Sequence, residues 1–170
     1  VKYTRIDLED PITLVHFPNA KNYFINGFPN NIGYFQKNLI EIISKFKIDK
    51  NNEKNKIKIG IHVRRADYVY EGSTLDICTA SYYEKGFEEI IKKKKLKLEN
   101  VQLLIFCEEL KWPDENLKIE GVEKKFVIGN DETSINDFKT MANCDHLVIS
   151  NSTYSWWAAR LGQNENSNIY

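Results

Sequence analysis

The chain is organised around one run of β-branched residues, Ile57-Lys58-Ile59-Gly60-Ile61-His62-Val63-Arg64-Arg65-Ala66-Asp67-Tyr68-Val69. Its apolar residues recur at every second position from 57 to 63, which is the period of a half-buried β-strand. Two arginines follow where this strand should end. Because successive side chains of an extended chain face opposite ways, Arg64 and Arg65 cannot both enter the apolar layer. At least one guanidinium group is therefore expected to face a ligand or water.

The position of the arginine pair favours phosphate binding. Ligands of open α/β sheets bind beyond the carboxyl ends of the strands, and Arg64 and Arg65 stand at such an end. A guanidinium group matches two phosphate oxygens with two parallel N–H donors. Taken alone, however, this segment favours the alternative interpretation, a solvated arginine pair without a ligand.

A second segment makes the ligand hypothesis stronger. It reads His146-Leu147-Val148-Ile149-Ser150-Asn151-Ser152-Thr153-Tyr154-Ser155-Trp156-Trp157-Ala158-Ala159, a buried-type strand followed by a hydroxyl-rich turn and the start of a helix. Backbone N–H groups and hydroxyls at a helix N-terminus bind anions. Two anion sites at strand ends of one small domain predict a single phosphorylated ligand bound between them.

The other elements alternate between strand and helix. Strands are expected over 12–16, 101–106 and 125–128 and near Asn168, and helices over 34–46, 81–95 and 134–143, the last burying Ile135, Phe138 and Met141. Such alternation predicts an α/β fold with a Rossmann-like, mostly parallel sheet flanked by helices. The sequence has no Gly-x-Gly-x-x-Gly and no Gly-Lys-Ser/Thr motif, so the common dinucleotide and P-loop fingerprints are absent.

Composition limits the classes of partner. The 170 residues are 42% hydrophobic with zero formal net charge, so one sizeable core is expected and no nucleic acid or acidic membrane is required as a partner. No apolar stretch approaches roughly 18 residues, so no transmembrane segment is expected. Cys78, Cys107 and Cys144 are far apart, which argues against a disulfide framework and a zinc site. The start at Val1 and the strand-like end at Tyr170 suggest a fragment of a longer protein.

The two segments also carry a family resemblance. The pattern His62-Val63-Arg64-Arg65-Ala66-Asp67, followed by Asn151 to Ala159, resembles the α-1,2-fucosyltransferases of glycosyltransferase family 11. Further similarity lies in the upstream landmark Gly33-Tyr34-Phe35-Gln36, in Leu104 to Glu109 with Trp112, and in Asp137, Met141, Cys144 and His146. The sequence departs from the family pattern at Asp145, Thr153, Tyr154 and Arg160.

The resemblance implies an inverting glycosyltransferase that moves L-fucose from GDP-fucose to the 2-hydroxyl of a galactose-containing glycan. It further implies a GT-B architecture of two Rossmann-like halves, of which this chain is the C-terminal, donor-binding half. Residues 1–32 would be a crossover or linker segment, and residues 33–170 the GDP-fucose-binding domain. The acceptor-side domain has no counterpart here, so the isolated fragment is expected to be inactive. The alternative is a non-catalytic nucleotide- or glycan-binding remnant of such an enzyme.

The resemblance also implies roles for single residues. Arg64 would grip the β-phosphate of GDP-fucose, and Asn151, Ser152 and Ser155 would donate to phosphate, with helix capping as the alternative for Ser155. Asp137 would accept from the guanine N1 and N2 groups, or instead form a capping box with Ser134. His62 would line the guanosine pocket or be a packed core histidine.

The general base stays open at this stage. Asp67 and Glu71 are the candidates, but a carboxylate close to arginines often only pairs with them. Arg65 would either brace the motif through Asp67 or touch the ligand. No Asp-x-Asp pair is present, so we expect metal-independent transfer with no cofactor beyond the donor. The parent enzyme would act in the cytoplasm if bacterial or viral, and in the Golgi lumen if of the animal type.

Overall fold

The structure, a computed structural model, describes residues 4–7, 23–26, 56–65, 69, 77–130 and 132–170. The chain divides into two compact units, residues 1–45 and 46–170. In the first, β1 (Thr4–Asp7) pairs in parallel with β2 (Tyr23–Asn26). The expected strand 12–16, the expected helix 34–46, the domain boundary at 32/33, Asp67 and Glu71 all lie outside the described residues.

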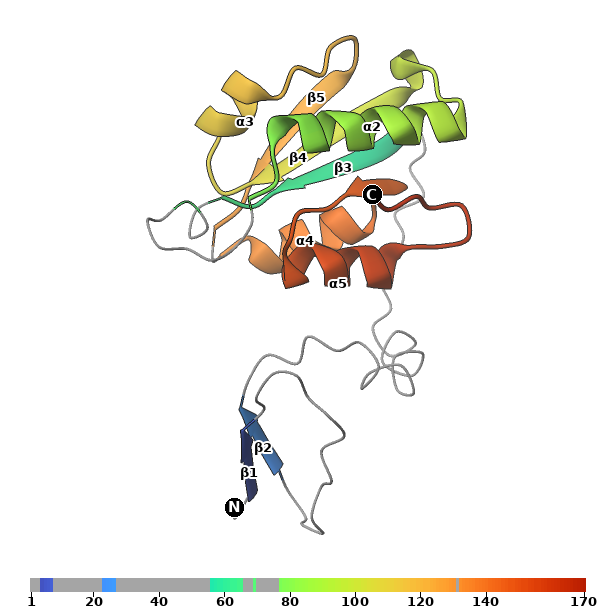
Figure 1. The fold of residues 1–170 in the computed structure, drawn as a ribbon. Coiled ribbons are helices and arrows are strands. Elements are labelled where there is room, and N and C mark those ends of the chain that lie inside the picture. The colour runs from blue at the N-terminus through green and yellow to red at the C-terminus, as the bar shows by residue number, and fades with distance from the viewer. Residues whose placement is uncertain (1–3, 8–22, 27–55, 66–68, 70–76, 131) are drawn as a thin grey trace. The chain divides into compact units, whose positions relative to one another are not determined.

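The described part of the second unit forms an all-parallel sheet in the order β5-β4-β3-β6 (Figure 1). Its strands are β3 (Ile57–Val63), β4 (Val101–Cys107), β5 (Glu123–Ile128) and β6 (His146–Val148). The chain runs outward from β3 through β4 to β5 and then returns to the other side of β3. The predicted Rossmann-like α/β fold is confirmed.

Helices cover both faces of this sheet (Figure 1). On one face, α2 (Ala80–Lys94) and Trp112 of α3 (Lys111–Asn116) pack against the odd-numbered residues of β3 and β4. On the other face, α4 (Ser134–Ala142) and α5 (Thr153–Gly162) pack against Leu104, Phe106 and Leu147. Burial on both faces explains why β4 is apolar at nearly every position, as parallel strands require.

Small residues let the layers approach closely. A Cβ on Gly86 of α2 would lie 2.7 Å from Val148 Cγ1, so only glycine fits where α2 crosses β6. A Cβ on Gly162 would overlap the Ala142 carbonyl, so α5 and α4 meet backbone to backbone at that point. The positions of the two glycines therefore fix how tightly the helices pack.

Four details differ from the sequence-based expectations. Ile135 was predicted to be buried in α4 but is 69% exposed, because it lies on the face of the helix that turns away from the sheet. The short helix α3 and the 3₁₀ turn Leu98–Asn100 were not predicted. The expected last strand is reduced to a parallel bridge between Leu147 and Ile169. The three cysteines are free, as expected.

Candidate functional site

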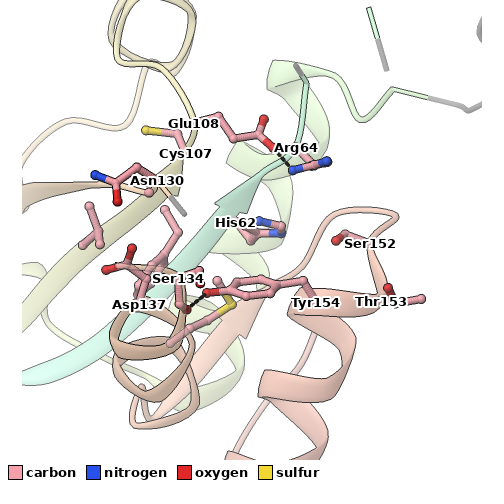
Figure 2. Close-up of a pocket in the computed structure, with 14 residues that line it drawn as sticks. His62, Arg64, Cys107, Glu108, Asn130, Ser134, Asp137, Ser152, Thr153 and Tyr154 are labelled. Atoms are coloured by element: carbon pink, nitrogen blue, oxygen red, sulfur yellow. Dashed lines mark hydrogen bonds and ion pairs between the residues drawn. The ribbon is translucent and has the colours of Figure 1, made fainter. Parts of the chain in front are cut away.

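A cavity of about 420 Å³ lies at the carboxyl ends of the strands in the second unit (Figure 2). It is bordered by the ends of β3, β4 and β5 and by the first turns of α4 and α5. The strand order reverses between β3 and β6, and ligands of open α/β sheets bind at this kind of switch point. The lining residues are His62, Arg64, Phe106, Cys107, Glu108, Val127, Gly129, Asn130, Ser134, Asp137, Met141, Ser152, Thr153 and Tyr154.

The alternation of β3 separates the two arginines. His62 and Arg64 are even-numbered and lie on the side of α4 and α5, where they line the cavity. Arg65 is odd-numbered and lies toward α3, with its guanidinium carbon 4.1 Å from the centre of the Trp112 ring. Arg65 is thus placed for a cation–π contact and not among the residues that line the cavity.

Glu108 holds the end of the arginine segment. Its Oε1 accepts a charge-assisted hydrogen bond from Arg64 Nη1, and its Oε2 accepts from the Arg65 backbone N–H at 3.3 Å. The Arg64 and Glu108 side chains are 33% and 27% exposed, so the pair borders the cavity without being cut off from water. The pair fixes a cation at one side of the cavity.

His62 lies deep beneath the arginine and is only 6% exposed. Its Nδ1 is 2.8 Å from the Ser150 hydroxyl, and its ring centre is 5.7 Å from that of Tyr154. Burial, reinforced by the nearby Arg64 cation, lowers the pKa of His62 to about 4. The imidazole is therefore neutral at physiological pH, and it lines the cavity as a packed, hydrogen-bonded side chain.

Asp137 carries the negative charge at the other side of the cavity, across from Arg64 in the view of Figure 2. Its Oδ2 accepts a 2.6 Å hydrogen bond from the Thr133 hydroxyl. The N-cap of α4 is Thr133 and not Ser134, so the capping box proposed for Ser134 and Asp137 does not form. The carboxylate is instead held at the start of α4, close to Gly129 of the turn after β5.

Tyr154 joins the two helices that border the cavity. Its hydroxyl donates a 2.6 Å hydrogen bond to the Ser134 carbonyl (Figure 2). Its ring stands edge-on to Phe138 of α4, with the ring centres 5.3 Å apart. Burial and the Asp137 charge raise the pKa of the phenol to about 12, so it remains a donor. This contact couples the first turn of α5 to the first turn of α4.

The start of α5 faces the cavity. Ser152 is the N-cap and lines the cavity with Thr153, and within the described residues the Ser152 side chain makes no capping hydrogen bond. The first N–H groups of a helix then keep donor capacity for an anion. Ser155 is fully buried, and its hydroxyl donates back to the Ser152 carbonyl at 3.2 Å. Asn151 is exposed on the preceding turn and is not among the lining residues.

The structure therefore brings together four of the residues selected from the sequence, namely His62, Arg64, Asp137 and Ser152. Arg65, Asn151 and Ser155 lie outside the lining, and Asp67 is not described. Glu108, Asn130, Ser134 and Tyr154 also line the cavity, but the sequence indicated no role in ligand binding for them. The signal for Glu108 was its place just after the apolar strand, within the segment Leu104 to Glu109 that resembles the family. No group of His, Cys, Asp or Glu in the described part of the chain is arranged to hold a metal ion.

Comparison with known proteins adds the family. The model of "Glycosyl transferase family 11" matches residues 2–170. The chain belongs to this family. The matched residues include both segments that the sequence analysis singled out.

Curated relatives match part of this chain. The chain is 30% identical over 109 residues to an alpha-1,2-colitosyltransferase of Escherichia coli, and the match covers 61% of this chain and 36% of that protein. It is 29% identical over 106 residues to the O-antigen biosynthesis glycosyltransferase WbnK of Escherichia coli, with 59% and 33% covered. Galactoside alpha-(1,2)-fucosyltransferase 1 of Homo sapiens is 20% identical over 127 residues, with 71% and 33% covered.

The matched region thus spans about a third of the length of these relatives. No solved structure matches the chain significantly. None of the helices in the described residues is long and apolar enough to cross a membrane.

Proposed function

We propose that this chain binds GDP-fucose in the cavity at the carboxyl end of the sheet, as the donor-binding part of an inverting α-1,2-fucosyltransferase. The proposal rests on one observation in this family 11 chain. A single cavity has the Arg64 guanidinium and the N-terminus of α5 at one side and the Asp137 carboxylate at the other. In the full reaction, L-fucose would pass to the 2-hydroxyl of a galactoside acceptor.

Charge placement supports the assignment of the two ends of the donor. The diphosphate is an anion and would contact Arg64 and the N–H groups at the start of α5. The guanine N1 and N2 groups are donors and would contact the Asp137 carboxylate. Adenine and uracil do not offer this pair of donors in the same arrangement, so Asp137 gives the site a basis for choosing guanine.

The role proposed for Arg64 follows from the chemistry of the leaving group. Negative charge grows on the β-phosphate as the bond between fucose C1 and the phosphate oxygen breaks. A guanidinium group that is already in place stabilises this charge most in the transition state, which raises kcat and not only affinity. We assign the role of general base to none of the described lining residues. Asp67 and Glu71 remain the candidates for it.

Calorimetric titration of this chain with GDP, ADP and UDP tests the donor assignment. We expect GDP to bind at least about tenfold more tightly than the other two, a difference of about 1.4 kcal/mol. Asp137→Asn should reduce the GDP preference toward parity, because the amide presents an N–H₂ group to the guanine donors. Asp145→Asn, at the opposite end of the sheet, is the matched control and should keep the preference. Equal affinity for all three nucleotides in the unmodified chain contradicts the proposal.

A transfer assay separates the enzyme from its alternative, a nucleotide- or glycan-binding remnant. Fucose release from GDP-fucose and fucose transfer to a galactoside are measured on a protein that contains this chain. Transfer that is lost in the Arg64→Ala variant supports the transferase, whereas tight GDP binding without transfer supports the remnant.

A further inference from the structure

We propose that Glu108 is a positioning residue that holds the Arg64 guanidinium toward the diphosphate. The carboxyl ends of β3 and β4 would then act together in anion binding. This inference rests on the donor site proposed above and adds a residue to it. Glu108 would not touch the nucleotide as an attractive contact, since its carboxylate carries the same sign of charge as phosphate.

The register of the sheet places Glu108 beside Arg64. β3 and β4 pair in parallel with Val63 opposite Cys107, so the next position along both strands sets Arg64 opposite Glu108. The neighbouring pair His62 and Phe106 faces the cavity, and the same parity points Arg64 and Glu108 to that side. Their contact is thus dictated by strand pairing and alternation, not by the chance approach of two long side chains.

Both carboxylate oxygens are used. Oε1 accepts from Arg64 Nη1 (Figure 2), and Oε2 accepts from the backbone N–H of Arg65. The carboxylate therefore bridges a side chain and the main chain of the same segment. This bridging fixes the direction of the Arg64 side chain where the strand has already ended. A guanidinium group has five N–H donors, so one carboxylate does not exhaust its capacity for phosphate oxygens.

Ordering Arg64 before the ligand arrives has an energetic consequence. A free arginine side chain loses rotamer freedom when it binds phosphate, and this loss weakens binding. If Glu108 restricts the side chain beforehand, much of that loss has already occurred on folding. A simple electrostatic role predicts the opposite result, since removal of a negative charge near an anion site should tighten anion binding.

The two effects are separated by three variants titrated with GDP. Glu108→Ala removes both acceptors, and we expect Kd to rise about tenfold. Glu108→Gln keeps one acceptor oxygen and should raise Kd by less, about threefold. Glu109→Gln is the matched control, because it removes the same charge one residue away while its amide oxygen can still accept from the Trp112 N–H that Glu109 now binds. The control should stay within about twofold of the unmodified chain.

A second readout does not depend on nucleotide binding. Phenylglyoxal modifies accessible, unpaired arginines, and the rate at Arg64 is followed by mass spectrometry of the peptide that contains Arg64 and Arg65, with fragmentation to assign the site. We expect faster labelling of Arg64 in Glu108→Ala, intermediate labelling in Glu108→Gln and no change in Glu109→Gln. Arg65, held on Trp112, should change less than Arg64.

The outcomes decide between the readings of Glu108. Tighter GDP binding by Glu108→Ala, or unchanged binding together with unchanged Arg64 labelling, overturns the positioning role. If the unmodified chain binds no GDP, the donor proposal fails, and Arg64 labelling alone then supports or overturns the positioning role. If Glu108→Ala does not fold, as judged by its thermal transition, Glu108→Gln carries both measurements.

Discussion

The parallel sheet of the second unit has one cavity at its carboxyl end and another at its amino end. The amino-end cavity is the larger, but the carboxyl-end cavity is the better candidate for a nucleotide site. The carboxyl-end cavity measures about 420 Å³ and the amino-end cavity about 480 Å³. Each contains a buried histidine, a cation and a carboxylate. The amino-end cavity is lined by Lys56, Ile57, Lys94, Leu96, Asn100, Asp145, His146, Asn164 and Asn166.

The difference between the two ends is the direction of the helices around them. α4 and α5 begin at the carboxyl end, so the positive ends of two helix dipoles face that cavity. α2 ends at the amino end, where the basic side chains Lys92, Lys93 and Lys94 accompany its negative end. At the amino end, the lysine charges are offset by the negative end of the α2 dipole. At the carboxyl end, the Arg64 cation adds to the positive ends of the α4 and α5 dipoles. The direction of the helices, and not cavity volume, therefore favours the carboxyl end for the proposed anion site.

The largest expected effect tests this contrast with one cation from each end. Arg64→Lys keeps the charge but offers a point charge in place of a fork, so GDP Kd should rise roughly ten- to hundredfold, a loss of about 1.5–3 kcal/mol. Arg64→Ala should cost more, and Lys94→Ala should leave GDP binding nearly unchanged. Titration and thermal unfolding are measured on the same samples. A lowered melting temperature with GDP affinity intact would assign Arg64 a purely structural role.

The second effect compares the two buried histidines by pH. The pKa of His62 falls from 6.5 to about 4 on folding, so the unfolded chain takes up the proton first as the pH is lowered. Its contribution is therefore complete above pH 6.5 and is lost as the pH falls from 6.5 toward 4. Urea unfolding across this range should show a shallower loss in His62→Gln than in the unmodified chain.

His146 gives the control for that experiment. Burial and Lys94 lower the pKa of His146, but the Asp145 carboxylate opposes them, so its contribution should be smaller. His146→Gln should therefore flatten the pH dependence less than His62→Gln does. Equal slopes in the His62 variant and the unmodified chain would mean that His62 is protonated in the folded state.

The third effect concerns the packing of α4 on α5, the two helices whose N-termini lie at the carboxyl end of the sheet. In Gly162→Ala the new methyl group would overlap the Ala142 carbonyl, and α4 and α5 must move apart. We expect a loss of about 1–3 kcal/mol in the free energy of unfolding, measured in urea. Gly129→Ala is the control, because its new methyl group would have ordinary contacts of 3.5 Å to Asp137 Oδ2 and 4.0 Å to the Cys107 carbonyl. Equal stabilities for the two variants would contradict the close packing of α4 on α5.

The smallest effect sharpens the separation of the adjacent arginines. Arg65→Lys loses the planar group over Trp112 while keeping its charge, so stability should fall by about 0.5 kcal/mol and GDP Kd should change by less than about twofold. If Arg65→Lys weakens GDP binding as much as Arg64→Lys, the assignment of the two arginines by strand parity is wrong.

The sequence by itself determined the type of most elements and the family. The period of two in residues 57–63 predicted β3, and the apolar run after Val101 predicted a strand buried on both faces, because hydrophobic periodicity reflects local geometry. The opposite directions of Arg64 and Arg65 also follow from alternation alone. The motifs at both strand ends indicated the family that the comparison then showed.

The tertiary structure decided which residues meet. Glu108 lies opposite Arg64 only because β3 and β4 pair in the register Val63 to Cys107, and register depends on strands 44 residues apart in the chain. Ile135 fits the helical period of α4 yet is exposed, because the rotation of a helix is set by the partner it packs on. Asp137 accepts from the Thr133 hydroxyl and does not form the capping box expected with Ser134, because the N-cap of α4 is Thr133. Local pattern fixes the type of an element and the alternation of its side chains, whereas long-range packing decides which partner each face meets.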